Sequence, residues 1–128
     1  MSKAVFDSSA ILAIYFDEKG KDEALRLLDL YEPMIATPNL SELYTKLIES
    51  GLTSNEIEES FSGLEIRIRD FDEQLAIIAA ELRPRTKAFG LSLGDRSCLA
   101  LALSENAIAV TSDRDWKKAK VCKVETIR

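Results

Sequence analysis

Short apolar, strand-like runs alternate with helix-like segments along the whole chain. The strand-like runs cover 3–6, 33–38, 64–71, 107–112 and 121–127. Between them apolar residues recur at helical spacing, which predicts helices over 9–16, 21–31, 39–50, 53–64, 72–82, 94–106 and one or two turns at 113–119. In 64–71 the alternation is strict, which is typical of a half-exposed strand with Leu64, Ile66 and Ile68 on one side. We expect 85–93 to be a loop.

This alternation predicts βαβ units, in which successive strands lie parallel and helices cover both faces of the sheet. The predicted fold class is therefore α/β. It is a three-layer α/β/α arrangement around a central, mostly parallel sheet of about five strands. The 128 residues contain no linker, repeat or low-complexity tract, so we interpret 1–128 as a single domain.

Two of the predicted strands run directly into acidic residues. The stretch "KAVFDSS" reaches Asp7 after an apolar run, and "AIAVTSDRDW" reaches Asp113 in the same way. The carboxyl ends of parallel strands lie at one edge of a sheet, where α/β proteins form their sites. We therefore expect Asp7 and Asp113 to share that edge.

The chain contains no histidine. Its absence excludes Ser-His-Asp and Cys-His nucleophilic schemes, zinc held by histidine, and the usual general base near neutral pH. Carboxylates or lysines must then carry any catalysis. Grouped carboxylates generally bind Mg²⁺ or Mn²⁺.

Cysteine usage and hydropathy indicate the compartment. Cys98 and Cys122 have no CxxC spacing, and we interpret both as free thiols of a reducing environment. No apolar run approaches the ~20 residues that span a bilayer, and the start of the chain does not resemble a signal peptide. We expect a cytoplasmic protein without membrane association.

The net charge of −5 argues against a DNA-binding module built on a basic face. The charge is uneven, however. The segment 83–87 ("RPRTK") contains three basic residues and no acid, and the segment from Arg114 onward is also rich in lysine. Both are ordinary solvated surface or, alternatively, flanks that guide a polyanion.

Two further acids differ in how well the pattern explains them. Asp95 opens the apolar helix 94–106 on the side of Cys98 and Leu99, where it either caps the helix or needs a partner. Glu42 projects nearly opposite the apolar stripe of 39–50, which favours an ordinary surface residue. Periodicity alone does not select Glu42 as a site residue.

Four segments together resemble one known family. "AVFDSSA", "TPNLSELYTKL", "LSLGDRSCLALA" and "AVTSDRDW" occur in order along the whole chain. They resemble the PIN domain and, more narrowly, the VapC-type toxin ribonucleases of bacterial type II toxin–antitoxin systems. Each segment alone is a weak signal, whereas four in sequence are a strong one.

The resemblance implies which residues form the site. The acidic positions of the family, both catalytic and metal-binding, correspond to Asp7, Glu42, Asp95 and Asp113. Ser8 matches the small hydroxyl residue after the first acid and Thr111 the one before the fourth, both as hydrogen-bonding support. Asp115 is given at most an auxiliary role.

The resemblance also implies a Mg²⁺-dependent endoribonuclease, with Mn²⁺ as a possible substitute. Its partners would be RNA as substrate, a cognate antitoxin, and a second copy in a homodimer. Our hypothesis is that Asp7 and Asp95 bind the metal directly, while Glu42 and Asp113 hold its waters or a second ion. In-line attack by water would leave a 5′-phosphate and a 3′-hydroxyl.

Other readings of a strand-end aspartate stay open. A phosphatase of the haloacid-dehalogenase type expects an acid where this chain has Ser9. A receiver-like signalling domain needs an acidic pair that the region around Asp7 lacks. A catalytically silent partner-binding module has no reason to bear the electrostatic cost of grouped carboxylates.

Overall fold

The central sheet has five strands, and all of them run parallel. The computed structural model describes residues 1–128. The strand order is β3-β2-β1-β4-β5, and each of the four neighbouring pairs is parallel. The strands are β1 (Lys3–Phe6), β2 (Glu32–Ala36), β3 (Arg67–Arg69), β4 (Ile108–Thr111) and β5 (Val124–Thr126).

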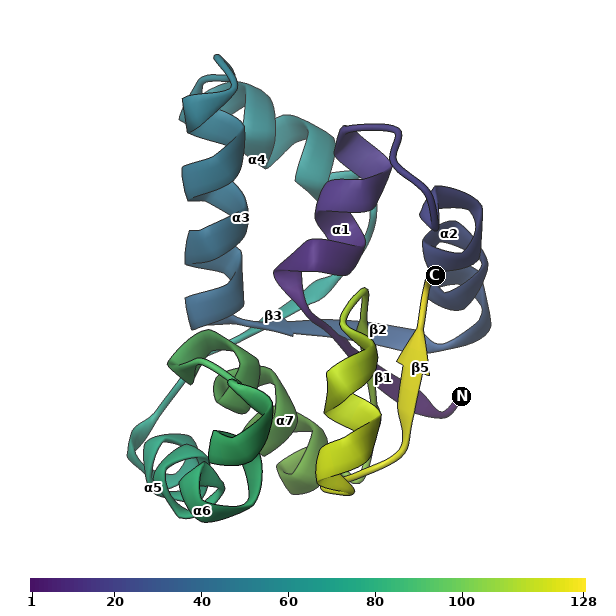
Figure 1. The fold of residues 1–128 in the computed structure, drawn as a ribbon. Coiled ribbons are helices and arrows are strands. Elements are labelled where there is room, and N and C mark those ends of the chain that lie inside the picture. Colours follow the sequence, from purple (N-terminus) through teal and green to yellow (C-terminus); the bar gives the residue numbers. More distant parts are fainter.

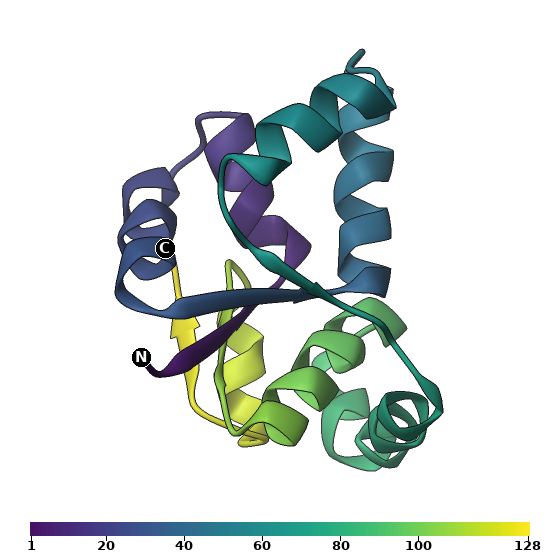
Figure 2. The same cartoon turned by 180° about the vertical axis from the view of Figure 1, so that it is seen from behind.

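Helices cover both faces of this sheet, as Figure 1 shows. The α-helices are α1 (Ser8–Tyr15), α2 (Lys21–Leu30), α3 (Thr37–Glu49), α4 (Ser54–Ser62), α5 (Glu73–Glu81), α6 (Arg83–Thr86) and α7 (Leu93–Glu105). Two 3₁₀ helices are η1 (Lys87–Phe89) and η2 (Arg114–Ala119). Helices α1 to α4 lie on one side of the strands, and α5 to α7 with η2 lie on the other (Figures 1 and 2). The predicted three-layer α/β/α fold is confirmed.

Two apolar clusters hold the layers together, one on each face. Val5 of β1 points into the cluster under α5, α7 and η2, whereas its neighbour Phe6 points into the cluster under α1 to α4. Met34 and Ile35 of β2 divide in the same way. Side chains of a strand alternate between faces, so a sheet buried on both faces needs continuous apolar strands.

The edge strand β3 is much shorter than the predicted strand 64–71. Glu65 has a left-handed backbone (φ 55°), which interrupts extended structure before Arg67. Ile66 is buried, but Ile68 remains 47% exposed. Ile68 is paired with Ile35 at the outer edge of the sheet, where no further strand follows.

The predicted loop over 85–93 is wrong for its first half. Helix α6 begins at Arg83 with Pro84 in its first turn, and η1 follows it directly. Pro84 ends α5 but also suits the start of the next helix, because the missing N–H has no partner there in any case. The Thr86 hydroxyl, fully buried, donates 2.9 Å to the Leu82 carbonyl and ties this turn to α5.

Two simpler predictions concern cysteines and membrane helices. Cys98 and Cys122 are free, and Cys98 is buried in α7. Burial and the nearby Asp7 charge raise the pKa of the Cys98 thiol well above its usual range. No helix has the length and apolar character to cross a membrane.

Candidate active site

Asp7 lies at the carboxyl edge of the sheet, where the neighbouring strands β1 and β4 end. It directly follows β1 and precedes α1, and its backbone N–H donates 2.8 Å to the Val110 carbonyl of β4. The Thr111 hydroxyl, at the end of β4, donates 3.0 Å to Oδ2 of Asp7. The backbone N–H of Asp113 then donates 3.1 Å to Oγ1 of Thr111. The two strand ends named by the sequence therefore share one edge.

The Asp7 carboxylate is buried among hydrogen-bond donors but has no cationic partner. Its side chain is 5% exposed and forms no salt bridge. Oδ2 also accepts 2.7 Å from the Ser9 hydroxyl, and Oδ1 accepts a long bond of 3.4 Å from Asn39 Nδ2. A buried carboxylate without a compensating positive charge is costly.

Burial is the main reason that the pKa of Asp7 is raised from 3.8 to about 6. The hydrogen bonds from Ser9 and Thr111 act in the opposite direction, since they favour the charged form. The negative charges of Asp95 and Glu42 raise the pKa further. A bound cation would offset both burial and repulsion.

Asn39 joins three parts of the site and was not predicted. Its side chain is fully buried in the first turn of α3, just after β2. Nδ2 donates 3.1 Å to Oε1 of Glu42 and 2.9 Å to the Gly94 carbonyl, in addition to the long bond to Asp7. Its Oδ1 is buried without a partner. A sequence signal did exist, because Asn39 follows a strand end one turn before Glu42.

Glu42 is an exposed residue, as periodicity indicates, yet its carboxylate is directed to the site. Oε1 accepts from Asn39 and, at 3.4 Å, from the Ser8 hydroxyl. Gly94 of α7 lies directly against it. A Cβ at position 94 would be 2.5 Å from Oε2 of Glu42, so only glycine permits this approach. Helices α3 and α7 thus meet across the carboxylate.

Asp95 both caps α7 and belongs to the acidic edge. Its Oδ2 accepts 2.9 Å from the Ser92 backbone N–H, while its own N–H donates 3.2 Å to Ser92 Oγ. These reciprocal bonds form a capping box. The pKa of Asp95 is raised, mainly by burial and also by the Asp113 charge, although the bonds from Ser92 lower it.

Two serines after β1 and two aspartates after β4 each form their own hydrogen bonds or ion pairs at this edge. Ser8, predicted as hydrogen-bonding support, donates to Glu42, whereas the neighbouring Ser9 donates to Asp7 and accepts 3.0 Å at Oγ from the Ser112 N–H. Oδ1 of Asp113 accepts 2.9 Å from the Asp115 N–H and so caps η2. The Asp115 carboxylate pairs with Lys118 at 2.9 Å. Sequence reasoning missed Ser9 because two serines follow Asp7 and the pattern does not separate them.

The four predicted acids lie at one edge, but their carboxylates do not converge on a common centre. No three acidic or cysteine side chains are close enough together to hold a metal ion as they stand. None of the surface hollows is lined by these acids. Glu42 and Asp113 are exposed, Asp95 is half-buried and Asp7 is buried. Mg²⁺ usually takes one or two carboxylates and keeps several waters. The all-oxygen donor set and the uncompensated Asp7 fit such an ion.

Helices α1, α3 and α7 all begin at this edge (Figure 1). The N-terminus of a helix carries partial positive charge and unpaired N–H groups. Three such ends favour negative groups at the edge, both the carboxylates already there and an anionic ligand. The arrangement defines an α/β protein with an acidic site at the carboxyl ends of β1 and β4.

Comparison with known proteins agrees with this class. A family model described as "PIN domain" matches residues 4–121. The chain therefore belongs to the PIN domain family, which separates it from the phosphatase and receiver classes considered above. No curated protein matches the sequence.

Several solved structures share the fold over nearly their whole length. The DNA-bound VapBC of Salmonella typhimurium has a TM-score of 0.75 at 20% identity, with 100% of both chains covered. A toxin–antitoxin complex from Klebsiella pneumoniae has a TM-score of 0.75 at 20% identity, covering 98% of each chain. VapBC-5 of Mycobacterium tuberculosis has a TM-score of 0.63 at 22% identity, covering 100% of this chain and 99% of that one.

Proposed function

We propose that this protein is a metal-dependent endoribonuclease, the toxin of a toxin–antitoxin pair. The observation that carries the proposal is Asp7, a buried carboxylate without a cationic partner at an edge where three further acids gather. Membership of the PIN domain family and the likeness to chains from VapBC complexes support it. Glu42 and Asp113 are exposed at this edge, which suits a polymer lying across the surface rather than an enclosed small molecule.

Asp7 and Asp95 are the residues that would hold the metal, with Glu42 and Asp113 acting through its waters. When bound, Mg²⁺ or Mn²⁺ would supply charge stabilisation at the scissile phosphate and a more acidic water. The donor set favours hard cations, because every side chain offers oxygen.

The residues of the chain then have distinct tasks. Thr111, Ser9 and Asn39 hold the Asp7 carboxylate in one orientation. Asn39 keeps Glu42 close to Gly94 at the start of α7. Glu42 or Asp113 would orient the attacking water or take its proton. The expected products carry a 5′-phosphate and a 3′-hydroxyl.

The proposal includes partners and a compartment. One neighbour is described as a toxin–antitoxin complex and another as a member of the VapBC family of toxin–antitoxin systems. We infer a cognate antitoxin, a homodimer and a cytoplasmic location for this chain. Exposed apolar side chains on two helices support a protein partner. Leu30 of α2 is 52% exposed and Ile48 of α3 is 49% exposed.

The test is RNA cleavage by the purified protein with Mg²⁺, with Mn²⁺ and with chelator. Wild type should cleave only with metal and should leave 5′-phosphates. Asp7→Asn and Asp95→Asn should lose cleavage, whereas the exposed control Asp29→Asn should keep it. Mutants that fold normally and still cleave would contradict the site, and a 2′,3′-cyclic phosphate would contradict the chemistry. Wild type that binds metal but cleaves no RNA would favour a silent partner-binding module.

A further inference from the structure

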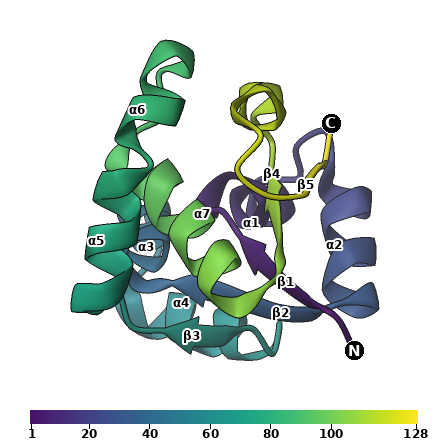
Figure 3. The same cartoon turned by 90° about the horizontal axis from the view of Figure 1, so that it is seen from below.

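The two basic segments of the chain come together in the fold. Arg83, Arg85 and Lys87 lie on α6 and η1, and Lys117, Lys118 and Lys120 lie on and directly after η2. The Arg85 guanidinium donates to the Lys120 carbonyl and so connects the segments across 35 positions. Seen from below in Figure 3, α6 and the yellow-green η2 project on the same side, away from β2 and β3.

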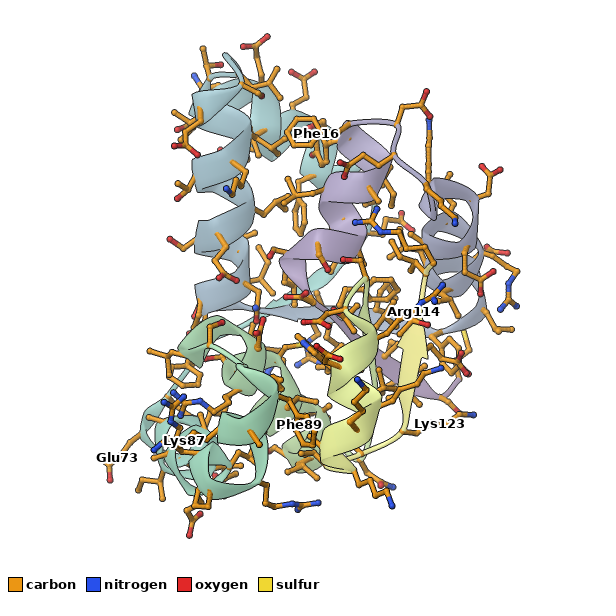
Figure 4. All side chains as sticks on the ribbon, in the orientation of Figure 1. Phe16, Glu73, Lys87, Phe89, Arg114 and Lys123 are labelled. Carbon is orange, nitrogen blue, oxygen red and sulfur yellow. The ribbon has the colours of Figure 1, made fainter.

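Apolar packing fixes the two segments relative to one another. Phe89 of η1 packs against the cluster that contains the fully buried Trp116 and Ala119 of η2. Figure 4 shows Phe89 between the green segment and η2, with Lys87 on the outer side. Arg114 and Lys123 lie apart from this surface, beside β5 in Figure 4. The basic ridge is therefore defined by Arg83, Arg85, Lys87, Lys117, Lys118 and Lys120.

Most of the positive charge on this ridge is not neutralised within the protein. Lys118 pairs with Asp115, but the other five residues of the ridge form no salt bridge. All six residues are exposed. In a protein of net charge −5, such a surface is a local exception that attracts a polyanion.

Both parts of the ridge are attached to the acidic edge. Segment η1 leads through Ser92 into α7, which carries Asp95, and η2 begins at Asp113. A strand bound along the ridge would therefore continue to the carboxylates. We propose that the basic ridge binds the phosphate backbone of single-stranded RNA and delivers it to the acidic edge. This inference rests on the proposed function, because it names the surface that holds the substrate of that site.

The first test measures binding without catalysis. Metal-free protein in chelator is titrated into a fluorescent, unstructured single-stranded RNA at several salt concentrations. Lys87→Glu combined with Lys117→Glu should weaken binding about tenfold at low salt and reduce the slope of log K against log salt by about 1.4. The single-site control is Lys46→Glu, at an exposed position of α3, which should bind as wild type does. Unfolding temperatures of all variants are compared to exclude misfolding.

Each outcome decides the question. Unchanged binding by the double variant, or an equal loss in Lys46→Glu, would overturn the ridge as the binding surface. Tighter binding of a DNA duplex of the same length would overturn the assignment to RNA.

A second measurement separates this inference from the proposed function. In the metal-dependent cleavage assay, the double variant should raise KM about tenfold with little change in kcat. If wild type cleaves RNA and the double variant has an unaltered KM, RNA binding by the ridge is refuted while the proposed nuclease function is supported. If wild type cleaves no RNA while RNA binding still depends on the ridge, the proposed nuclease function is refuted and RNA binding by the ridge is supported.

Discussion

The hydroxyl of Thr111 donates a hydrogen bond of 3.0 Å to Oδ2 of Asp7. Thr111 ends β4 and Asp7 follows β1, so one bond links two strands that are neighbours only in the fold. It stabilises the charged form of a carboxylate whose pKa is raised by burial.

Thr111→Val should therefore raise the pKa of Asp7 further and weaken metal binding. Valine keeps the shape of the side chain but removes the donor. We expect about tenfold lower Mg²⁺ affinity, as for other residues that support metal ligands. Carbon-13 NMR titration of the Asp7 carboxyl and calorimetric titration with Mg²⁺ check this. Thr45→Val, at an exposed position of α3, should change neither, and an unshifted Asp7 titration would refute the role of Thr111.

Asp7→Asn should stabilise the metal-free protein above pH 6. The folded protein binds the Asp7 proton with a pKa of about 6, against 3.8 ordinarily. Folded protein thus holds more protons than unfolded protein between those values, and stability falls as pH rises through this window. The full loss is about 3 kcal/mol.

The measurement is urea unfolding in chelator from pH 3.5 to 7.5. Wild type should lose clearly more stability across the window than Asp7→Asn does, since Asp95 still titrates in the variant, and Mg²⁺ should restore only the wild type. Asp29→Asn should follow the wild-type curve. Equal pH dependence of wild type and Asp7→Asn would show that Asp7 is not the titrating group.

Asn39→Asp should make the fold dependent on metal. The change places a third carboxylate between Asp7 and Glu42 and removes the donor that both share. Loss of hydrogen bonds at a buried polar group costs about 1–3 kcal/mol, and the added charge increases it. Thermal unfolding should show a large drop in chelator and partial recovery with Mg²⁺. Asn55→Asp, at an exposed position of α4, should leave the unfolding temperature almost unchanged. A similar drop in that variant would show that the effect does not depend on the site.

Gly94→Ala should reduce activity far more than stability. The new Cβ would be 2.5 Å from Glu42 Oε2, and this flexible carboxylate can move away at little cost. We expect less than about 1 kcal/mol of destabilisation, since alanine also favours the helix. RNA cleavage should fall at least about tenfold, because a small displacement of a catalytic group strongly lowers the reaction rate. Gly63→Ala serves as the control, and full activity of Gly94→Ala would separate Glu42 from catalysis.

The order of elements and the shared edge of Asp7 and Asp113 were predictable, because both follow from strand and helix periodicity in a parallel sheet. Glu42 was different. Its position on the helix is that of a surface residue, and only resemblance to a family singled it out. Its contacts depend on how α3 meets α7, which no local pattern contains.

The same limit explains what was missed. In the sequence, Asn39 stands where a residue that caps or begins a helix is expected. It becomes buried only because α7 packs over it. The predicted loop over 85–93 did not allow for Pro84, which lies in the first turn of α6 and suits the start of a helix. The beginning of the strand-like run at 64–71 is shortened by Glu65, whose left-handed backbone conformation is unusual for glutamate.

The pairing of β1 with β4 also has a consequence for synthesis on the ribosome. Asp7 emerges early, but the strand that orients it includes Val110 and Thr111, which are translated more than a hundred residues later. A nascent chain therefore has no assembled carboxylate edge until translation is almost finished. The proposed ribonuclease activity therefore cannot arise until translation of the chain is almost complete.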